Sequence, residues 1–452
     1  MKLWRIALPL GLYSITSAMF FPVSQSLIYW KVCLGSQEFT NITREDCSNK
    51  KISSSNQYLQ TEANLIFLIG SIVMTLTAIF AGTLIGKLGD ERSRKLALVV
   101  PFVGLFFADV VLILLCFFVD SSSYLYILSE AIFGLSGGYV TILSSSFAYG
   151  SHLAKVSGFE RSRAMSVLEG AIGSGSVIGF FSTSVITQIG YLNAYVAMTV
   201  IHVICIVLIL TMEDIKPRTE EIQSKKKKFL SRLSDKLTSW RQLFSSPQNR
   251  KKLLILISSF SLSFFAFIGT INIIFYYLKH RFHWDLQLYS FLKAPQQLTS
   301  TLAIIFLFPF LKTKLELSDP TLALLGLMSR CLGRIWLAIS WNTASVYFLI
   351  VLDSLSRFSP TAIRSMLSKT VSEDEQGRVF SLISVAELIC TLLASVVFHT
   401  LFPYSISFFP QISFVIMGII VIPPIGLIWY HRELLSGRTK KTTEKEENVA
   451  LT

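Results

Sequence analysis

The chain has 452 residues, of which 52% are hydrophobic and 15% are charged, and its formal net charge is +13. Its mean hydropathy of +0.57 excludes an ordinary soluble protein of this length. The composition predicts a polytopic membrane protein.

The order of apolar segments predicts twelve membrane spans. An apolar helix needs about 20 residues to cross a bilayer, and this length sets the window. The candidate spans are residues 6–29, 63–85, 96–119, 124–149, 164–188, 193–212, 252–278, 288–311, 319–340, 345–367, 379–402 and 408–430. The first is too long and too aromatic for a cleaved signal peptide, so we interpret it as a helix.

The basic residues indicate the orientation of the spans. With the N-terminus in the cytosol, about 30 of the Lys and Arg lie in cytosolic segments, about 6 outside and about 5 within helices. Both termini are therefore predicted to be cytosolic. The net positive charge follows from this topology and from attraction to anionic lipid headgroups, and no nucleic-acid partner is expected.

The first loop, residues 31–62, is then extracellular or luminal. It contains the glycosylation sequon Asn41-Ile42-Thr43 and two cysteines, Cys33 and Cys47. A disulfide between these cysteines would suit an oxidising compartment. The other four cysteines lie inside spans as packing residues, and no metal-ligand spacing is present, so no metal site is expected.

The polar stretch 213–251 divides the spans six and six. We expect a first six-helix bundle over 1–212, a cytosolic linker over 213–251, a second bundle over 252–431 and a cytosolic tail over 432–452. The segment "ERSRAMSVL" at 160–168, opening the fifth span, is similar to "EQGRVFSLI" at 375–383, opening the eleventh. A match at corresponding positions of two halves indicates the parallel repeat of major facilitator proteins, an all-α membrane fold.

The loop "GKLGDERSRK" at 86–95 resembles the loop motif of the same proteins. Gly86 would permit close backbone approach, and Asp90 could pair with Arg94 or Lys95 to hold one conformation. The sequence departs from the motif at Glu91, where a basic residue is usual, and at Ser93, where glycine is usual.

A more specific resemblance lies in "TAIRSMLSKTVSEDEQGRVFSLI", which is similar to the tenth helix and following loop of solute carrier family 46. "GGYVTILSSSFAY", "VLEG" and "FHW" agree with it, so the resemblance covers most of the chain. It implies secondary transport. It also implies a cysteine before Trp284 that bridges to the first loop, but His283 stands there, which leaves Cys33 with Cys47 as the alternative pair.

The tenth span carries three ionisable residues, Asp353, Arg357 and Arg364. At about 100° per residue they fall within roughly 40° of one another, so they form one polar stripe facing a watery cavity or a partner helix. Asp353 and Arg357, spaced i, i+4, either pair with each other or contact substrate. Arg364, just beyond Pro360, is expected to contact an anion or form a gating ion pair, with snorkelling to the cytosolic surface as the alternative.

The ninth span adds Arg330 and Arg334, also spaced i, i+4. They either widen the preference for polyanions or neutralise buried acids such as Asp353, and the sequence favours neither account.

Five acidic residues lie within spans: Asp109, Glu130, Glu169, Asp353 and Glu387. A carboxylate in a desolvated cavity can take up a proton on one side of the membrane and release it on the other. Glu169 is the first candidate for proton coupling, because the resemblance places it at an acid that the family uses in this way. Glu130 and Asp353 follow, whereas Asp109 and Glu387 are expected to form interhelical hydrogen bonds.

Polar and aromatic side chains that could stack on or hydrogen-bond to a ring-containing solute are Tyr149, Asn272, Tyr276 and Tyr277.

These features predict a secondary transporter that moves an organic anion, folate-like, steroid-conjugate or muropeptide-like, by proton symport with alternating access. The alternatives are a proton-independent uniporter and a receptor or scaffold with a transporter fold. No catalytic motif or P-loop is present, so neither an enzyme nor an ATP-driven pump is expected, and protons rather than a cofactor would be the coupling species. The plasma membrane and the lysosomal membrane both fit the topology, and the sequence indicates no oligomeric state.

Overall fold

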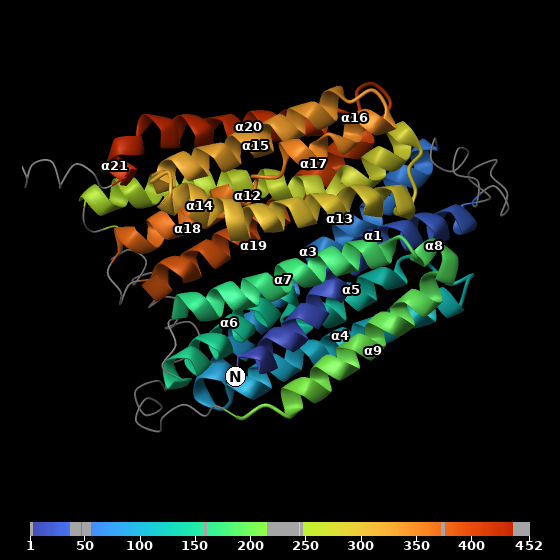
Figure 1. Cartoon of the computed structure of the whole chain (residues 1–452). Helices are drawn as coiled ribbons and strands as arrows, with labels where there is room; N and C mark the ends of the chain where they lie inside the picture. The colour runs from blue at the N-terminus through green and yellow to red at the C-terminus, as the bar shows by residue number, and fades with distance from the viewer. Residues whose placement is uncertain are drawn as a thin grey trace, which may run out of the picture. The chain divides into compact units, whose positions relative to one another are not determined.

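The structure is a computed structural model that describes residues 3–36, 47, 56–157, 161–214, 244, 247–371 and 376–436. Within these residues all regular secondary structure is helical (Figure 1). The elements are α1 (Trp4–Gly35), α3 (Gln57–Glu91), α4 (Arg94–Phe117), α5 (Leu125–Leu135), α6 (Gly138–Ser157), α7 (Arg161–Thr183), α8 (Ile186–Ile189), α9 (Tyr191–Leu210), α12 (Pro247–Phe282), α13 (Leu286–Leu302), a π-helix (Ala303–Leu307), α14 (Phe308–Thr313), α15 (Asp319–Ile339), α16 (Thr343–Tyr347), α17 (Leu349–Leu352), α18 (Phe358–Thr370), α19 (Gln376–Ser405), α20 (Ile412–Tyr430) and α21 (Arg432–Ser436).

Ten helical segments of the described chain are long and apolar enough to cross a membrane, so the protein is a multi-pass membrane protein. The other two predicted spans are helical as well. α7 (Arg161–Thr183) covers most of 164–188, and the span at 345–367 overlaps the short apolar helix Thr343–Leu352 and α18. The count of twelve spans and the cytosolic termini stay predictions. The sequon at Asn41, most of the linker 213–251 and the tail beyond Ser436 lie outside the described residues.

The chain forms two compact units. The first comprises Met1–Lys226, Ile271–Leu298 and Ser395–Pro410, and the second comprises Lys227–Thr270, Thr299–Ala394 and Gln411–Thr452. The ends of α12 and α19 thus belong to the first unit, whereas their beginnings belong to the second. The limits of the predicted six-helix bundles stay predictions.

Small residues set the helix packing inside the first unit. α7 packs along α1, and a Cβ atom on Gly179 would stand 2.2 Å from the Ile15 carbonyl oxygen. Gly175, one turn earlier, has the same relation to the Gly11 carbonyl oxygen, at 2.3 Å. Glycines spaced four apart let two membrane helices approach to backbone contact, which explains why this apolar stretch needs them.

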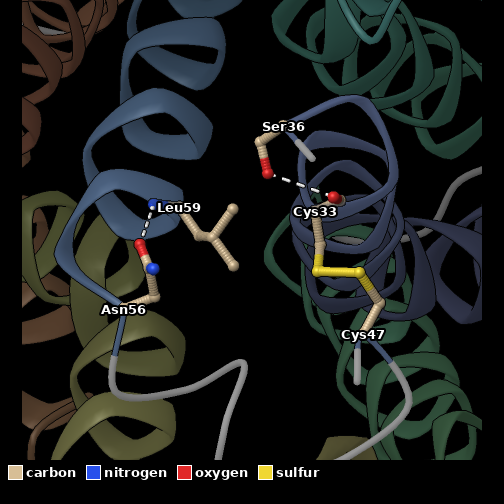
Figure 2. Close-up of a disulfide and its surroundings, with 5 residues drawn as sticks. All are labelled: Cys33, Ser36, Cys47, Asn56 and Leu59. Atoms are coloured by element: carbon tan, nitrogen blue, oxygen red, sulfur yellow. Dashed lines mark hydrogen bonds between the residues drawn. A yellow bond between two sulfur atoms is a disulfide. The ribbon is translucent and has the colours of Figure 1, made fainter. Parts of the chain in front are cut away.

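A disulfide follows the end of α1, joining Cys33 to Cys47 (Figure 2). The Ser36 hydroxyl donates to the Cys33 carbonyl at 3.0 Å beside it. α3 begins beyond this loop, where the Asn56 side chain accepts from the Leu59 N–H at 3.2 Å and so caps the helix. This end of the first unit is the one that the sequence places outside the cytosol.

Four side-chain hydrogen bonds, here called the outer polar contacts, join helix ends within the first unit. Three join α1 or α3 to α12 or α19, and one joins α12 to α19. They link Gln25 to the Asn272 carbonyl, Asn272 to Ser395, Ser71 to Ser395 and Asn64 to His399, at 2.9, 3.1, 2.8 and 2.9 Å. All are neutral pairs, so they fix the helix ends in one arrangement without any ionic bond.

Candidate functional site

The tenth predicted span is not a continuous helix. α17 ends at Leu352, residues 353–357 form turns, and α18 begins at Phe358. Pro360 accounts for part of the break, because it lacks the N–H that would bond the carbonyl of Ser356 four residues earlier. The expected polar stripe on one helix face is therefore wrong, and Asp353 and Arg357 lie instead at a break in the helix.

The free carbonyl of Ser356 is used by an arginine of the neighbouring helix. Arg330 on α15 donates from Nη2 to this oxygen at 3.2 Å. It also donates from Nη1 to the carbonyl and the hydroxyl of Ser263 on α12, each at 2.8 Å. Its guanidinium lies over the Phe267 ring, 5.1 Å from the ring centre. Arg330 is only 5% exposed, and these hydrogen bonds all go to neutral acceptors.

One helical turn further along α15, Arg334 forms a buried ion pair. Its Nη2 lies 2.9 Å from Oδ2 of Asp353, and the two side chains are 3% and 9% exposed. Gly333 leaves room for this pair, since a Cβ atom there would stand 3.4 Å from Asp353 Oδ1. The structure thus pairs Asp353 with Arg334, which agrees with the account in which the arginines of the ninth span neutralise a buried acid. Whether Asp353 also pairs with Arg357 or contacts substrate stays a prediction.

We name Arg330, Arg334 and Asp353, with their partners Ser263 and Ser356, the arginine cluster. It buries two guanidiniums against one carboxylate. Among the described residues, Nε of Arg330 and both Nε and Nη1 of Arg334 are buried without a hydrogen-bond partner. An unsatisfied buried N–H of a charged group is costly, and a guanidinium matches carboxylate, sulfate or phosphate oxygens. The chemistry of these donors matches that of an anion's oxygen atoms.

Arg364, the residue expected to contact an anion or to form a gating ion pair, forms an ion pair with Glu387. Its Nη2 lies 2.5 Å from Oε1 of Glu387 on α19, and its guanidinium lies 5.3 Å from the centre of the Phe260 ring. Its side chain is 40% exposed, so it is a half-buried cation that ties α18 to α19. Arg357 is also half-buried, at the end of the helix break.

The fourth predicted span is interrupted as well. α5 ends at Leu135 and α6 begins at Gly138, and Gly137 and Gly138 have φ values of +101° and +62°, which L side chains rarely adopt. The fourth and tenth spans hold corresponding positions in the two predicted halves. Paired interruptions of this kind point to the binding region in transporters built from repeats.

The remaining candidate acids lie in the first unit. Glu130 on α5 is 5% exposed, beside Tyr126 and close to Gly70 of α3. Glu169 on α7 is exposed. It lies roughly 160° to 180° around the helix from the exposed apolar residues Val167 and Ile178, so it occupies a different face of α7.

The residues expected to stack on a solute are packed inside the first unit. Tyr149 is buried and donates to the Glu213 carbonyl at 2.8 Å. Tyr276 and Tyr277 are fully buried, and Asn272 is one of the outer polar contacts. In this structure these side chains contact other protein groups. They do not line an open cavity as an aromatic wall.

The family model for the Major Facilitator Superfamily matches residues 10–395 of this chain. The chain belongs to the Major Facilitator Superfamily. Among solved structures this facilitator is similar to a D-xylose–proton symporter (TM-score 0.65, 15% identity, 95% of this chain and 98% of that one). It is also similar to the peptide transporter POT bound to sulfate (TM-score 0.64, 10% identity, 96% and 99%).

The relatives of this facilitator are members of solute carrier family 46, which confirms the resemblance seen in the tenth-span motif. The lysosomal proton-coupled steroid conjugate and bile acid symporter of Gallus gallus is 26% identical over 92% of this chain and 91% of its own. The proton-coupled folate transporter of Rattus norvegicus is 27% identical over 84% and 82%. A probable peptidoglycan muropeptide transporter of Drosophila melanogaster is 22% identical over 88% and 78%.

The loop motif of the facilitator is held by backbone acceptors. Arg94 donates to the Ala148 carbonyl at 3.1 Å, and Lys95 donates to the carbonyls of Leu210 and Met212. The side chain of Asp90 lies outside the described atoms. Among the described residues, no heavy atom lies within 4 Å of the place of a Cβ on Gly86, and the close backbone approach expected there stays a prediction.

Sequence reasoning missed two parts of the facilitator. Ser263 and Ser356 belong to the arginine cluster, but nothing in the sequence distinguishes them from other serines within spans. The one sequence signal for Ser356 was Pro360, four residues later. The second part is a histidine of α9, His202, which had no obvious partner in the sequence but contacts Asp109.

Proposed function

We propose that this facilitator is a secondary transporter that moves an organic anion together with protons. The observation that carries the proposal is the arginine cluster, which buries one more guanidinium than carboxylate and has three guanidinium nitrogens without a hydrogen-bond partner among the described residues. An anion at this place would satisfy the donors and balance the charge, and it would lie at the break between α17 and α18.

The relatives support both the substrate class and the coupling. Their names describe proton-coupled movement of folate, or of steroid conjugates and bile acids, and muropeptide transport. Folates, bile acids and conjugated steroids are anions that combine a bulky apolar frame with a carboxylate or sulfate. We propose a substrate of this class here, carried across the lysosomal or the plasma membrane.

Uptake by purified protein in liposomes tests the proposal. Labelled folate, a steroid sulfate and a muropeptide are offered at an outside pH of about 5.5 or about 7.4, with the inside at about 7.4. We expect uptake of at least one anion that rises with outside acidity. Uptake that ignores pH would indicate a uniporter, and binding without uptake would indicate a receptor.

Variants of the cluster connect the transport to the site. Arg330→Gln and Arg334→Gln each remove charge-assisted hydrogen bonds worth about 1.5–3 kcal/mol, so the apparent affinity for the anion should fall about tenfold to a hundredfold. Arg432→Gln, an exposed arginine on α21 of the same unit, is the matched control. Equal affinities in all three variants would remove the cluster from the substrate site.

A further inference from the structure

A second buried ionisable cluster lies in the first unit, where three helices meet. Asp109 on α4 and His202 on α9 are in contact, with Oδ2 and Nδ1 2.5 Å apart and side chains 0% and 3% exposed. The other ring nitrogen of His202, Nε2, lies 2.8 Å from the Thr16 hydroxyl on α1. That hydroxyl donates its proton to the Tyr13 carbonyl at 2.8 Å.

With the Thr16 hydroxyl donating to the Tyr13 carbonyl, the contacts of this cluster correspond to a defined number of protons. Thr16 has one hydroxyl proton, which is used at Tyr13, so its oxygen must accept and Nε2 of His202 must carry a proton. Nδ1 and an ionised carboxylate are both acceptors when neither is protonated, so the short contact to Asp109 needs a second proton between them. The pair therefore holds two protons and is neutral overall, as carboxylic acid with imidazole or as carboxylate with imidazolium.

Release of one proton changes this arrangement in a defined way. The remaining proton then lies on Nδ1 and is donated to the Asp109 carboxylate, so Nε2 of His202 becomes an acceptor. The Thr16 hydroxyl must turn toward Nε2, and its bond to the Tyr13 carbonyl is lost. One proton leaves and the pair gains one negative charge. The hydrogen bond between His202 and Thr16 reverses its direction, and the bond within α1 from Thr16 to Tyr13 is lost.

The charges of Asp109 and His202 balance each other within the pair. Within the described residues, His202 is the one side chain that forms an ion pair with Asp109. Tyr195 on α9 lies within electrostatic reach of Asp109, and of Cys116 on α4 and Tyr191 on α9. The helices of this unit carry further titratable side chains, among them Tyr13 on α1, Glu130 on α5, Tyr139 on α6, Glu169 on α7 and Cys205 on α9. The Asp109 oxygen that does not face His202, Oδ1, is buried without a hydrogen-bond partner. A buried carboxylate with one free oxygen is suited to binding a proton.

The interface between α1 and α9 is polar from this pair toward the outer end of the unit. Ser24 and the Tyr195 hydroxyl are 2.8 Å apart, and Ser26 and the Tyr191 hydroxyl are 2.7 Å apart. Tyr191 is the first residue of α9 and is only partly buried. Hydroxyl groups thus occur at two levels between the pair and the end that the sequence places outside the cytosol.

We propose that Asp109 and His202 form a proton-binding site in the first unit, and that this site takes up the proton that drives transport. The inference rests on the proposed proton coupling and names the groups that perform it. It differs from the sequence-based candidates Glu169, Glu130 and Asp353, because the proton is shared by two helices, and its release alters the hydrogen bonds of a third.

A measurement of the histidine ring tests the site without any substrate. Full-length protein with ¹⁵N-labelled histidine is examined by NMR in nanodiscs between about pH 5 and pH 8, with His202→Gln to assign the signal. We expect Nε2 of His202 to be protonated at the acid end and to lose its proton as the pH rises, and the Asp109→Asn variant to lose this transition. A His202 ring that keeps one protonation state in the wild type throughout would overturn the inference.

Transport then tests the coupling. In liposomes, Asp109→Asn should abolish accumulation driven by an acid-outside gradient but keep the exchange of labelled for unlabelled anion at equal pH, because the amide can replace the protonated acid. His431→Gln, at the end of α20, is the control. Gradient-driven accumulation that persists in Asp109→Asn with the wild-type pH profile would contradict the inference. If the wild type itself shows no accumulation, the proposed proton coupling is refuted, and so is the role of Asp109 and His202 in driving transport. The NMR measurement decides separately whether this pair binds a proton.

Discussion

The ion pair between Arg334 and Asp353 allows a prediction in which stability and anion binding move in different directions. Both groups are buried, at 2% and 6% exposure, and their charged atoms are 2.9 Å apart. Removing one partner leaves the other charge buried without compensation, which costs about 3–5 kcal/mol. Replacing both by apolar residues of similar volume removes the pair and both desolvation penalties, so the double variant should be close to the wild type in stability.

The charge of the arginine cluster gives the second half of the prediction. Asp353→Leu removes the negative charge and frees Nη2 of Arg334, so the anion should bind more tightly, by about tenfold for each 1.4 kcal/mol gained. Arg334→Met should weaken binding. The double variant removes one charge of each sign, so the net charge of the cluster is unchanged and the affinity should return most of the way toward the wild-type value.

The assay is a double-mutant cycle on four purified proteins. Thermal stability is followed in detergent without ligand, and affinity for the labelled anion is measured by equilibrium binding at about pH 7.4. We expect a coupling energy of about 6–10 kcal/mol in magnitude, because each single variant loses about 3–5 kcal/mol and the double variant almost none. Additive effects on stability would show that the two side chains are not paired. Loss of anion binding in Asp353→Leu would show that the carboxylate is more than a counter-ion.

Three further predictions concern the backbone and the loop. Pro360→Ala restores an N–H that competes for the carbonyl used by the arginine cluster, so anion affinity should fall about tenfold, the cost of one charge-assisted hydrogen bond, with no loss of helicity by circular dichroism. Gly179→Ala should lower the melting temperature, since a Cβ there meets backbone and overpacking costs about 1–3 kcal/mol, while Gly170→Ala, where nothing lies within 4 Å, should not. Replacing Cys33 and Cys47 together by serine should cost about 3 kcal/mol, from a sequence separation of 14, and should abolish any effect of reductant on melting.

The fold could be predicted from the sequence because its main signals are local. Long apolar runs and the glycines of α7 follow from hydrophobic thickness and helix contact. The arginine pair on α15 and the acid at Asp353 were also visible as charged groups in an apolar setting. These features need only the residue type and its position along one helix.

The side-chain pairs could not be predicted from the sequence, because they depend on how different helices face one another. The sequence left open whether Arg334 neutralises Asp353, and only the break after Leu352 turns the carboxylate toward α15. The contact between Asp109 and His202 joins residues that are 93 positions apart, and no periodicity relates them. Helical spacing gives the angle of a side chain around its own axis, but the identity of its neighbour is a tertiary property.

The outer polar contacts set an energetic scale for opening this end of the first unit. A neutral hydrogen bond contributes about 1 kcal/mol net, so the three bonds that join α1 and α3 to α12 and α19 contribute about 3 kcal/mol. One proton moving down a gradient of about two pH units releases about 2.7 kcal/mol, at 1.36 kcal/mol per unit. The free energy of these hydrogen bonds and the free energy that one proton releases are of the same order. A membrane with one acidic side could therefore shift this end between closed and open with a single proton per cycle.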